Sequence, residues 1–421
     1  MFKKHKNQDL DMSFLWKKNP KPPNEYVKYS LELTSKLPGT TTLDNKKKLQ
    51  DDLLKYLTEI KEILISKDDL ELTNALHLEI NKMNFFIVLI NNLHELNLDI
   101  MKELNTIFTV ALNYSIDNKL VTVDYFVLHP KTVQLLLVKI ESILQQKTKY
   151  SNSTNSRNDM FSITGKMILE CTKYEQLCRI ILIKDTNFWK FFSFAKMNNF
   201  EISSLSFQIL ISLFTTNEKL VSKEFFNIES NSNKFIINMN KLIAHGNYVT
   251  KRQSLKLLHD LIIVKSNNIM MSYINSPENM KLIMTVMTDK SKLLQLDAFN
   301  IFKIFVANPR KTKPILDILI KNRDKLLLYL NNFADDSFDR MFKDEKEFII
   351  QEIESLPRLF SSTTDSIAST TPPTHKNSMS NGSLNSTANI VHTGASMNPH
   401  KIIGSPSSNS LSRTYQDSIS H

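Results

Sequence analysis

The chain has 421 residues, with 53 Lys and Arg against 43 Asp and Glu, so its formal net charge is +10. This length allows two or three domains or one elongated repeat array, and the charge suits an acidic partner without requiring nucleic acid. Only 6 residues are Gly, and they are scattered, whereas glycine-rich phosphate loops need several together because only glycine lets the backbone approach a phosphate. The composition therefore excludes a Walker loop, a GxGxxG turn and a glycine-rich kinase loop.

Residues 1–42 are predicted to form an N-terminal arm. The prolines at positions 20, 22, 23 and 38 favour an extended segment that leads to a first helix. The basic start lacks the apolar stretch of a secretory signal, and no run of about 18 apolar residues exists. We therefore expect a soluble, cytoplasmic protein without membrane insertion.

Residues 43–356 are predicted to form an all-α domain. Apolar residues recur at helical spacing, as at Leu53, Leu57, Ile60 and Leu64, and segments with strand-like alternation between tight turns are absent. Candidate caps and stops between the helices are Asn247, Ser276-Pro277, Asp289 and Asn308-Pro309.

Three helices share one apolar template, which indicates internal repeats. The template is Phe207, Leu210, Leu213, then Leu255, Leu258, Leu261, then Phe299, Phe302, Phe305, at steps of 48 and 44 residues. A small residue precedes each triple, namely Ser206, Ser254 and Ala298. Amphipathic helices repeated at roughly 40–47 residues are typical of armadillo or HEAT units, in which each unit covers the apolar face of its neighbour. The sequence therefore predicts an armadillo/HEAT-like superhelix.

Residues 357–421 are predicted to be a disordered tail. Ser and Thr make up about two fifths of this segment, and aromatic residues are almost absent, so it cannot bury enough apolar surface to offset its ordering entropy. Thr371-Pro372 and Ser405-Pro406 are candidate sites for proline-directed kinases.

No catalytic or metal-binding pattern is present, so we expect neither enzyme activity nor a cofactor. The sequence contains no HExxH, CxxC, CxxH, GxSxG or EF-hand loop. Cys171 and Cys178 lie seven residues apart in a segment expected to be helical, which would separate them by about 10 Å, too far for a disulfide. Binding is the remaining kind of function.

Tyr248, Arg252 and Lys256 lie at i, i+4 and i+8, so they share one face of a predicted helix while Leu255 and Leu258 face inward. An aromatic residue with two cations suits a partner-binding ridge. The alternative is an ordinary solvated helix face.

Four segments resemble the Mo-twenty-five family, also called calcium-binding protein 39-like. They are NYVTKRQSLKLL (Asn247–Leu258), SPENMKLIM (Ser276–Met284), DKSKLLQLDAFNIFKIFVANPRKTKPILDILIKN (Asp289–Asn322) and FKDEKEFI (Phe342–Ile349). The resemblance covers roughly residues 14–355. The Asn/Lys-rich composition and the long tail resemble a fungal member, of the type that works in the RAM morphogenesis network.

The resemblance implies a non-catalytic scaffold that binds a Ste20-like (germinal-centre) kinase or a pseudokinase relative and holds the kinase in its closed, active arrangement. Family positions on the concave kinase-binding face match Phe200, Tyr248 and Arg252, and Lys256 follows one turn on. We therefore expect the concave face to include the predicted stripe.

The resemblance also implies a second pocket, which takes a Trp-Glu-Phe tail motif of the partner. Its positions match Lys265, Lys281, Met284 and Lys321. Lys265 replaces a family arginine and so loses the planar fork that grips a carboxylate. The segment Ile263–Tyr273 is one residue shorter than the family pattern, so an expected Phe falls on Asn268 or on the gap. We expect the motif to be altered or bound more weakly.

By the same resemblance the chain is expected to be a monomer when free, to act in an NDR-family kinase network for polarised growth and cell separation, and to be enriched at growth or division sites. Two other classes stay open. A general armadillo peptide-binding adaptor would carry regularly spaced Asn and Trp on its inner helices, which the sequence lacks. A repeat-type RNA binder would show a salt-dependent affinity for RNA.

Overall fold

The structure is a computed structural model that describes residues 21–66, 68–145, 154–264, 268–333 and 340–358. Within these ranges every extended regular element is a helix, and the only β pairing is an isolated antiparallel bridge between Ile116 and Lys119. The predicted all-α class is confirmed. The predicted disordered tail and the tail phosphosites lie outside the described residues.

The chain divides into two compact units, one ending at Tyr273 and one beginning at Ile274. The helices up to this boundary are α1 (Pro23–Lys36), α2 (Leu43–Ser66), α3 (Leu70–Lys82), α4 (Phe85–Asn91), α5 (Leu98–Asn113), α6 (Val121–Leu128), α7 (Lys131–Gln145), α8 (Thr154–Thr172), α9 (Glu175–Arg179), α10 (Phe191–Phe194), α11 (Phe200–Thr215), α12 (Glu218–Leu220), α13 (Glu229–His245), α14 (Tyr248–Ile263) and α15 (Ile269–Ile274). The helices of the second unit are α16 (Pro277–Met287), α17 (Lys292–Ala307), α18 (Lys313–Asn331) and α19 (Arg340–Glu354). Short 3-10 or π-helical turns are η2 (Leu37–Gly39), η3 (Leu93–Glu95), η4 (Ile180–Lys184), η5 (Asn187–Lys190) and η6 (Val221–Phe225).

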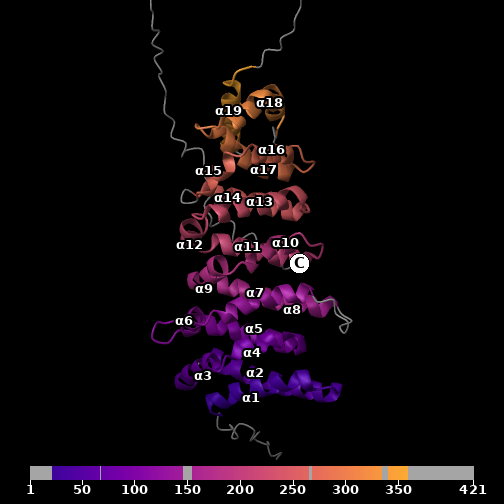
Figure 1. Ribbon diagram of the computed structural model, residues 1–421, viewed down its shortest axis with the longest axis vertical. Helices are drawn as coiled ribbons and strands as arrows, with labels where there is room; N and C mark the ends of the chain where they lie inside the picture. Colours follow the sequence, from indigo (N-terminus) through magenta and orange to yellow (C-terminus); the bar gives the residue numbers. More distant parts are fainter. Residues whose placement is uncertain (1–20, 67, 146–153, 265–267, 334–339, 359–421) are drawn as a thin grey trace, which may run out of the picture. The chain divides into compact units, whose positions relative to one another are not determined.

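The first unit is built from groups of three helices. The groups are α3 to α5, α6 to α8, α9 to α11 and α12 to α14, and the third helix of each has 16 to 19 residues. These third helices form a row that begins at α2, the helix before the first group. In this row α2 packs on α5, α5 on α8, α8 on α11 and α11 on α14 (Figure 1). Three helices to a group is the armadillo arrangement rather than the helix pairs of HEAT units.

Polar contacts between neighbouring groups recur at almost constant sequence separation. The Asn81 amide donates a hydrogen bond to the Thr122 hydroxyl across 41 residues, and the Tyr125 hydroxyl donates one to Asn84, also across 41. In the second unit, the ion pair between Lys303 and Glu345 spans 42 residues at 2.8 Å. This separation is the repeat length, so equivalent positions of successive groups face one another.

The predicted apolar template is buried in both units, with two triples on α11 and α14 and the third on α17. All nine residues of the three triples are at most 3% exposed, and the small residues before them, Ser206, Ser254 and Ala298, are fully buried. A small side chain at this position lets the neighbouring helix approach closely, so the repeat pattern has a direct packing cause.

Side-chain caps set the start of several helices. Asn199, Asn247 and Ser291 each accept a hydrogen bond from the backbone N–H three residues later, at the starts of α11, α14 and α17. Ser276 caps α16 in the same way, with Pro277 in the first turn as predicted. Asp289 is not a helix cap; its carboxylate accepts from the N–H of Ser291, which is the cap itself.

Two details differ from the sequence prediction. Residues 1–42 contain the helix α1, and its Tyr26 and Val27 are buried. Pro23 is compatible with this helix because it stands at the helix start, where its missing N–H costs nothing. Cys171 and Cys178 lie on different helices, α8 and α9, and both are free and buried.

None of the helices in the described ranges combines the length and the apolar character needed to cross a membrane. Across the same ranges, no cluster of three or more His, Cys, Asp or Glu side chains is placed to hold a metal ion.

Candidate functional site

Two aromatic side chains stand at the same end of neighbouring helices in the first unit. Phe200 and Tyr248 are the first residues of α11 and α14, directly after the caps Asn199 and Asn247. Phe200 is 69% exposed and Tyr248 is 45% exposed, whereas aromatic side chains of this size are usually well buried. The repeat register therefore gives both helices an aromatic residue at one edge of the row.

The start of α14 is tied to the segment before α11. The Thr250 hydroxyl donates to the backbone oxygen of Ala195 at 3.2 Å, and Thr250 is itself buried. This bond fixes the first turn of α14, and hence the backbone of Tyr248, relative to the approach to Phe200.

Along α14, Tyr248, Arg252 and Lys256 follow one another at intervals of four residues and form the α14 stripe. Tyr248 and Lys256 are exposed and Arg252 is half-buried, whereas the nearby Leu255 and Leu258 are fully buried. The interior placement of Tyr248 and Arg252 that would exclude a binding role is thus not observed. The stripe offers an aromatic face, a planar guanidinium and an ammonium, groups that recognise a protein surface.

The second unit contains an apolar groove between α16 and α18. We call it the unit-2 groove, and its volume is about 190 Å³. It is lined by Met284, Met287 and Thr288 in or directly after α16, and by Asn322, Lys325, Leu326 and Tyr329 of α18. Tyr329 closes the groove by donating its hydroxyl to the backbone oxygen of Met287 at 2.7 Å and by stacking on Phe333 at 5.2 Å. Burial raises the pKa of Tyr329 to about 12, because the surroundings disfavour the charged phenolate.

The predicted tail-motif residues map onto this groove in part. Met284 lines it, and Lys281 and Lys321 are exposed on the same two helices without lining it. Lys265 lies outside the described residues. The amide of Asn268, the residue at or next to which the resemblance expects a Phe, donates a hydrogen bond to the Asn227 side chain at 3.3 Å.

Lys325, Leu326 and Tyr329 belong to the groove but were missed from sequence. Their spacing from Lys321, at i+4, i+5 and i+8, places them around one side of α18, and that spacing was the available signal.

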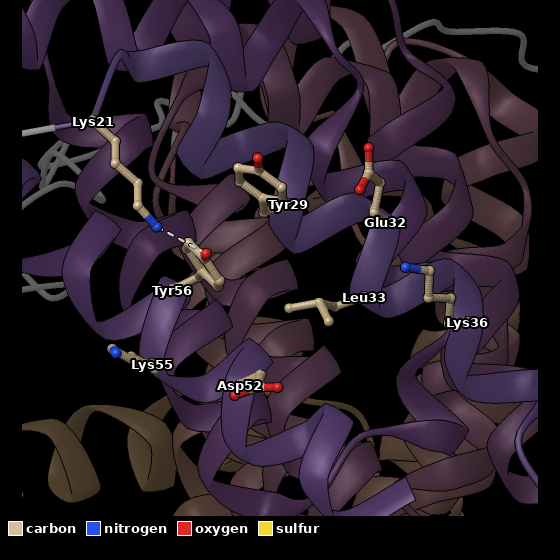
Figure 2. Close-up of a pocket in the computed structure, with 8 residues that line it drawn as sticks. All are labelled: Lys21, Tyr29, Glu32, Leu33, Lys36, Asp52, Lys55 and Tyr56. Carbon is tan, nitrogen blue, oxygen red and sulfur yellow. Dashed lines mark hydrogen bonds between the residues drawn. The ribbon is translucent and has the colours of Figure 1, made fainter. Parts of the chain in front are cut away.

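A third concavity lies between α1 and α2, and sequence reasoning did not identify it because the segment of α1 was assigned to an arm. It has a volume of about 330 Å³ and is lined by Lys21, Tyr29, Glu32, Leu33, Lys36, Asp52, Lys55 and Tyr56 (Figure 2). Lys21 Nζ donates to the Tyr56 hydroxyl at 2.8 Å and lies 4.4 Å from the centre of that ring. The hydrogen bond to Tyr56 raises the pKa of Lys21, so the chain's own ammonium is held against the aromatic wall.

Comparison with known proteins places these features in context. The model of a family described as Mo25-like matches residues 14–357. The chain is 54% identical over 371 residues to Protein HYM1 of Saccharomyces cerevisiae, covering 87% of this chain and 91% of that protein. It is 32% identical to the Mo25-like protein of Schizosaccharomyces pombe, over 82% of this chain and 100% of the relative. It is 34% identical to Calcium-binding protein 39-like of Homo sapiens, over 82% of this chain and 98% of the relative.

Proposed function

The chain belongs to the Mo25-like family, and from this premise we propose that it is a non-catalytic scaffold that binds and activates a Ste20-like (germinal-centre) kinase or a pseudokinase relative. The observation that carries the proposal is that Phe200 and Tyr248 stand exposed at the starts of neighbouring helices of one row, with the rest of the α14 stripe following Tyr248. These residues coincide with the positions that the family resemblance assigns to the kinase-binding face.

The mechanism is a shift of the kinase's conformational population. A kinase free in solution samples open and closed placements of its small-lobe helix αC, and a rigid surface that contacts only the closed placement raises its share by the difference in binding free energy. A change from about 10% to 90% active kinase needs about 2.6 kcal/mol of differential binding. One buried aromatic contact and one or two charged contacts supply that amount.

The unit-2 groove is proposed to take the partner's tail motif. Its apolar floor of Met284, Met287 and Leu326 suits the Trp and Phe side chains of a Trp-Glu-Phe sequence. The lysines around the groove suit the Glu carboxylate. The family resemblance gives Lys265 the position of an arginine in the motif pocket, and a lysine lacks the bidentate fork that grips a carboxylate, so we expect weaker motif binding.

The test is stimulation of phosphotransfer by a purified Ste20-like kinase domain that is titrated with this protein. We expect Tyr248→Ala combined with Arg252→Ala to abolish most of the stimulation and to leave the circular dichroism spectrum unchanged, because neither side chain belongs to the buried core. The melting temperature, measured on the same samples, shows that the double variant is folded. Lys241→Ala, at an exposed position of α13, is the matched control and should stimulate like wild type. Full stimulation by the folded double variant would remove this face from the proposal.

The proposal extends to a cytoplasmic role in a RAM-type kinase network for polarised growth and cell separation, with enrichment at growth or division sites. It is supported by the family membership and by 54% identity to a yeast relative. The chain should substitute for Protein HYM1 in Saccharomyces cerevisiae, as scored by cell separation and bud shape, and the double variant should not. Failure of the well-expressed wild-type chain to substitute would contradict this extension.

A further inference from the structure

The chemistry of the unit-2 groove specifies the kind of peptide that fits it. The floor is apolar, and two of its residues are methionines, whose flexible side chains adapt to a ring or an aliphatic group. Lys325 lines the groove, and Lys281 and Lys321 stand exposed within about one helical turn of lining residues. In the portion of the chain that the structure describes, none of these three lysines forms an ion pair with an acid. The groove therefore selects a short segment that carries apolar side chains next to a carboxylate.

The end of the described chain is fastened to α18, one of the two helices that form this groove. Arg323 of α18 donates from Nε to the backbone oxygen of Leu356 at 3.1 Å and from Nη2 to that of Glu354 at 2.9 Å. Arg323 is only 7% exposed, so these bonds lie in a sheltered position, and its neighbour Asn322 lines the groove. The last turn of α19 is thus held against the helix that forms one groove wall, and residues 359–421 continue from there.

The remaining chain is long enough to return. Tyr415 lies 57 residues beyond Arg358. A coil of that length has a root-mean-square span of about 40 Å, several times the diameter of α18, and such a tether gives an effective concentration in the millimolar range. A weak intrachain contact would therefore be well populated.

One segment beyond residue 358 matches the groove chemistry. The acids there are Asp365 and Asp417, and the aromatic residues are Phe360 and Tyr415. Only Tyr415 and Asp417 stand two residues apart, and Ile419 follows at the same spacing. In an extended peptide, residues i, i+2 and i+4 point to the same side, so a ring, a carboxylate and an aliphatic side chain would face the groove together.

We propose that, in the free protein, the segment Tyr415–Ile419 occupies the unit-2 groove of its own chain, with Tyr415 and Ile419 on the methionine floor and Asp417 facing the lysines. The consequence is autoinhibition of motif binding, because a partner's tail must displace this segment. That consequence rests on the proposed function of the groove, whereas the intrachain docking does not depend on it.

Crosslinking of the full chain tests the docking. The chain's own thiols are inert, because Cys171 and Cys178 are buried and burial raises the pKa of Cys178 to about 12. A benzophenone maleimide therefore labels Ser418→Cys selectively, with Ser380→Cys, in the middle of the tail, as the matched control. We expect Ser418→Cys to give at least fivefold more photoproduct on peptides of α16 and α18 than the control, and Met284→Glu to reduce it to the control level.

Mixing with isotope-labelled chains identifies the source of each crosslink. In an equal mixture, crosslinks that almost never join a labelled chain to an unlabelled one support the proposal. Equal yields from Ser418→Cys and Ser380→Cys would overturn it. Mixed crosslinks that make up about half of the total, as expected for random pairing of two chains, would also overturn it and would indicate a second copy as the occupant.

Competition tests the autoinhibition with a fluorescent synthetic peptide ending in Trp-Glu-Phe. We expect Tyr415→Ala combined with Asp417→Asn to tighten peptide binding about three- to tenfold, since a groove that is free only about 10–30% of the time binds correspondingly weakly. Asp365→Asn is the control and should bind like wild type. Equal affinities in all three proteins would overturn the autoinhibition and leave the proposed function intact. If no protein binds the peptide, the motif role of the groove fails and the crosslinking alone decides the docking.

Discussion

At the scale of single residues, Tyr329 is the side chain that joins the two walls of the unit-2 groove. Its hydroxyl bonds the Met287 backbone oxygen at 2.7 Å while its ring stacks on Phe333. Tyr329→Phe keeps the ring and removes the bond, so we expect the free energy of unfolding of the second unit to fall by about 1 kcal/mol at pH 7. Urea denaturation followed by circular dichroism measures the change. A stability equal to wild type would mean that the bond is not formed in solution.

The same substitution predicts a difference at alkaline pH. Burial raises the pKa of Tyr329 from about 10 to about 12, so the folded state holds the phenolic proton more tightly than the unfolded state does. The stabilisation is fully present below pH 10 and is lost as the pH rises toward 12. Wild type should therefore lose stability more steeply than Tyr329→Phe over this interval, as measured by urea midpoints at successive pH values. Parallel curves would argue against the buried hydroxyl.

Asp117 and Asn118 form a tight turn in which both backbones are left-handed, with φ of 50° and 61°. Ile116 and Lys119 exchange two backbone hydrogen bonds across it, at 3.0 and 2.9 Å. Because glycine adopts this conformation without steric cost, Asn118→Gly should raise stability by a few tenths to about 1 kcal/mol, and Asn118→Ala should lower it. Melting temperatures decide the order of the three proteins; Ala above Gly would contradict the argument.

At the scale of elements, the contact between α8 and α11 depends on Gly165. A Cβ atom placed there would lie 2.5 Å from Leu205 Cδ2 and 3.0 Å from Leu205 Cγ. Gly165→Val should lower the free energy of unfolding by about 1–3 kcal/mol, because the branched side chain overlaps Leu205. Adding Leu205→Ala should recover part of the loss, so the double variant should be more stable than the sum of the two single effects predicts. If urea titrations show that the effects of Gly165→Val and Leu205→Ala on the free energy of unfolding simply add, then α8 and α11 move apart without overlap between these side chains.

An element could be predicted from the sequence where burial produces a regular spacing of apolar residues. The triples beginning at Phe207, Leu255 and Phe299 were predictable because every member is buried in the same register, and the cap at Asn247 because its chemistry is local. The three-helix grouping was not predictable, because α9 and α12, with 5 and 3 residues, are too short to show a helical period.

For the candidate sites, residues that share one helix could be predicted from the sequence, whereas the pairing of two helix faces could not. Tyr248, Arg252 and Lys256 were found because one helix carries them all at regular spacing. The unit-2 groove was found only through Met284, since its other wall comes from α18 and nothing local in the sequence indicates which faces of two helices meet. The concavity at Tyr56 was missed for a related reason: the prolines before α1 favoured an extended arm, whereas Pro23 begins a packed helix.

At the scale of the whole molecule, a repeat architecture makes stability a sum of local and nearest-neighbour terms. The polar links at separations of 41 and 42 residues join adjacent groups in the first unit, as between Asn84 and Tyr125, and neighbouring helices in the second, as between Lys303 and Glu345. A defect in one group should therefore propagate to its neighbours and fade beyond them, in contrast to the all-or-none response of a single globular core.

Phe302→Ala tests this expectation, because Phe302 is fully buried in α17 and its truncation should cost about 3–5 kcal/mol. In native-state hydrogen exchange, amides of α16, α17 and α19 should exchange faster, while amides of α2 and α5 keep wild-type rates. Phe108→Ala, at an equally buried position of α5, should give the mirror result, with faster exchange in α2, α5 and α8 and an unchanged second unit. If either variant accelerates exchange uniformly along the chain, the molecule unfolds as one cooperative body, and the nearest-neighbour description of its stability is wrong.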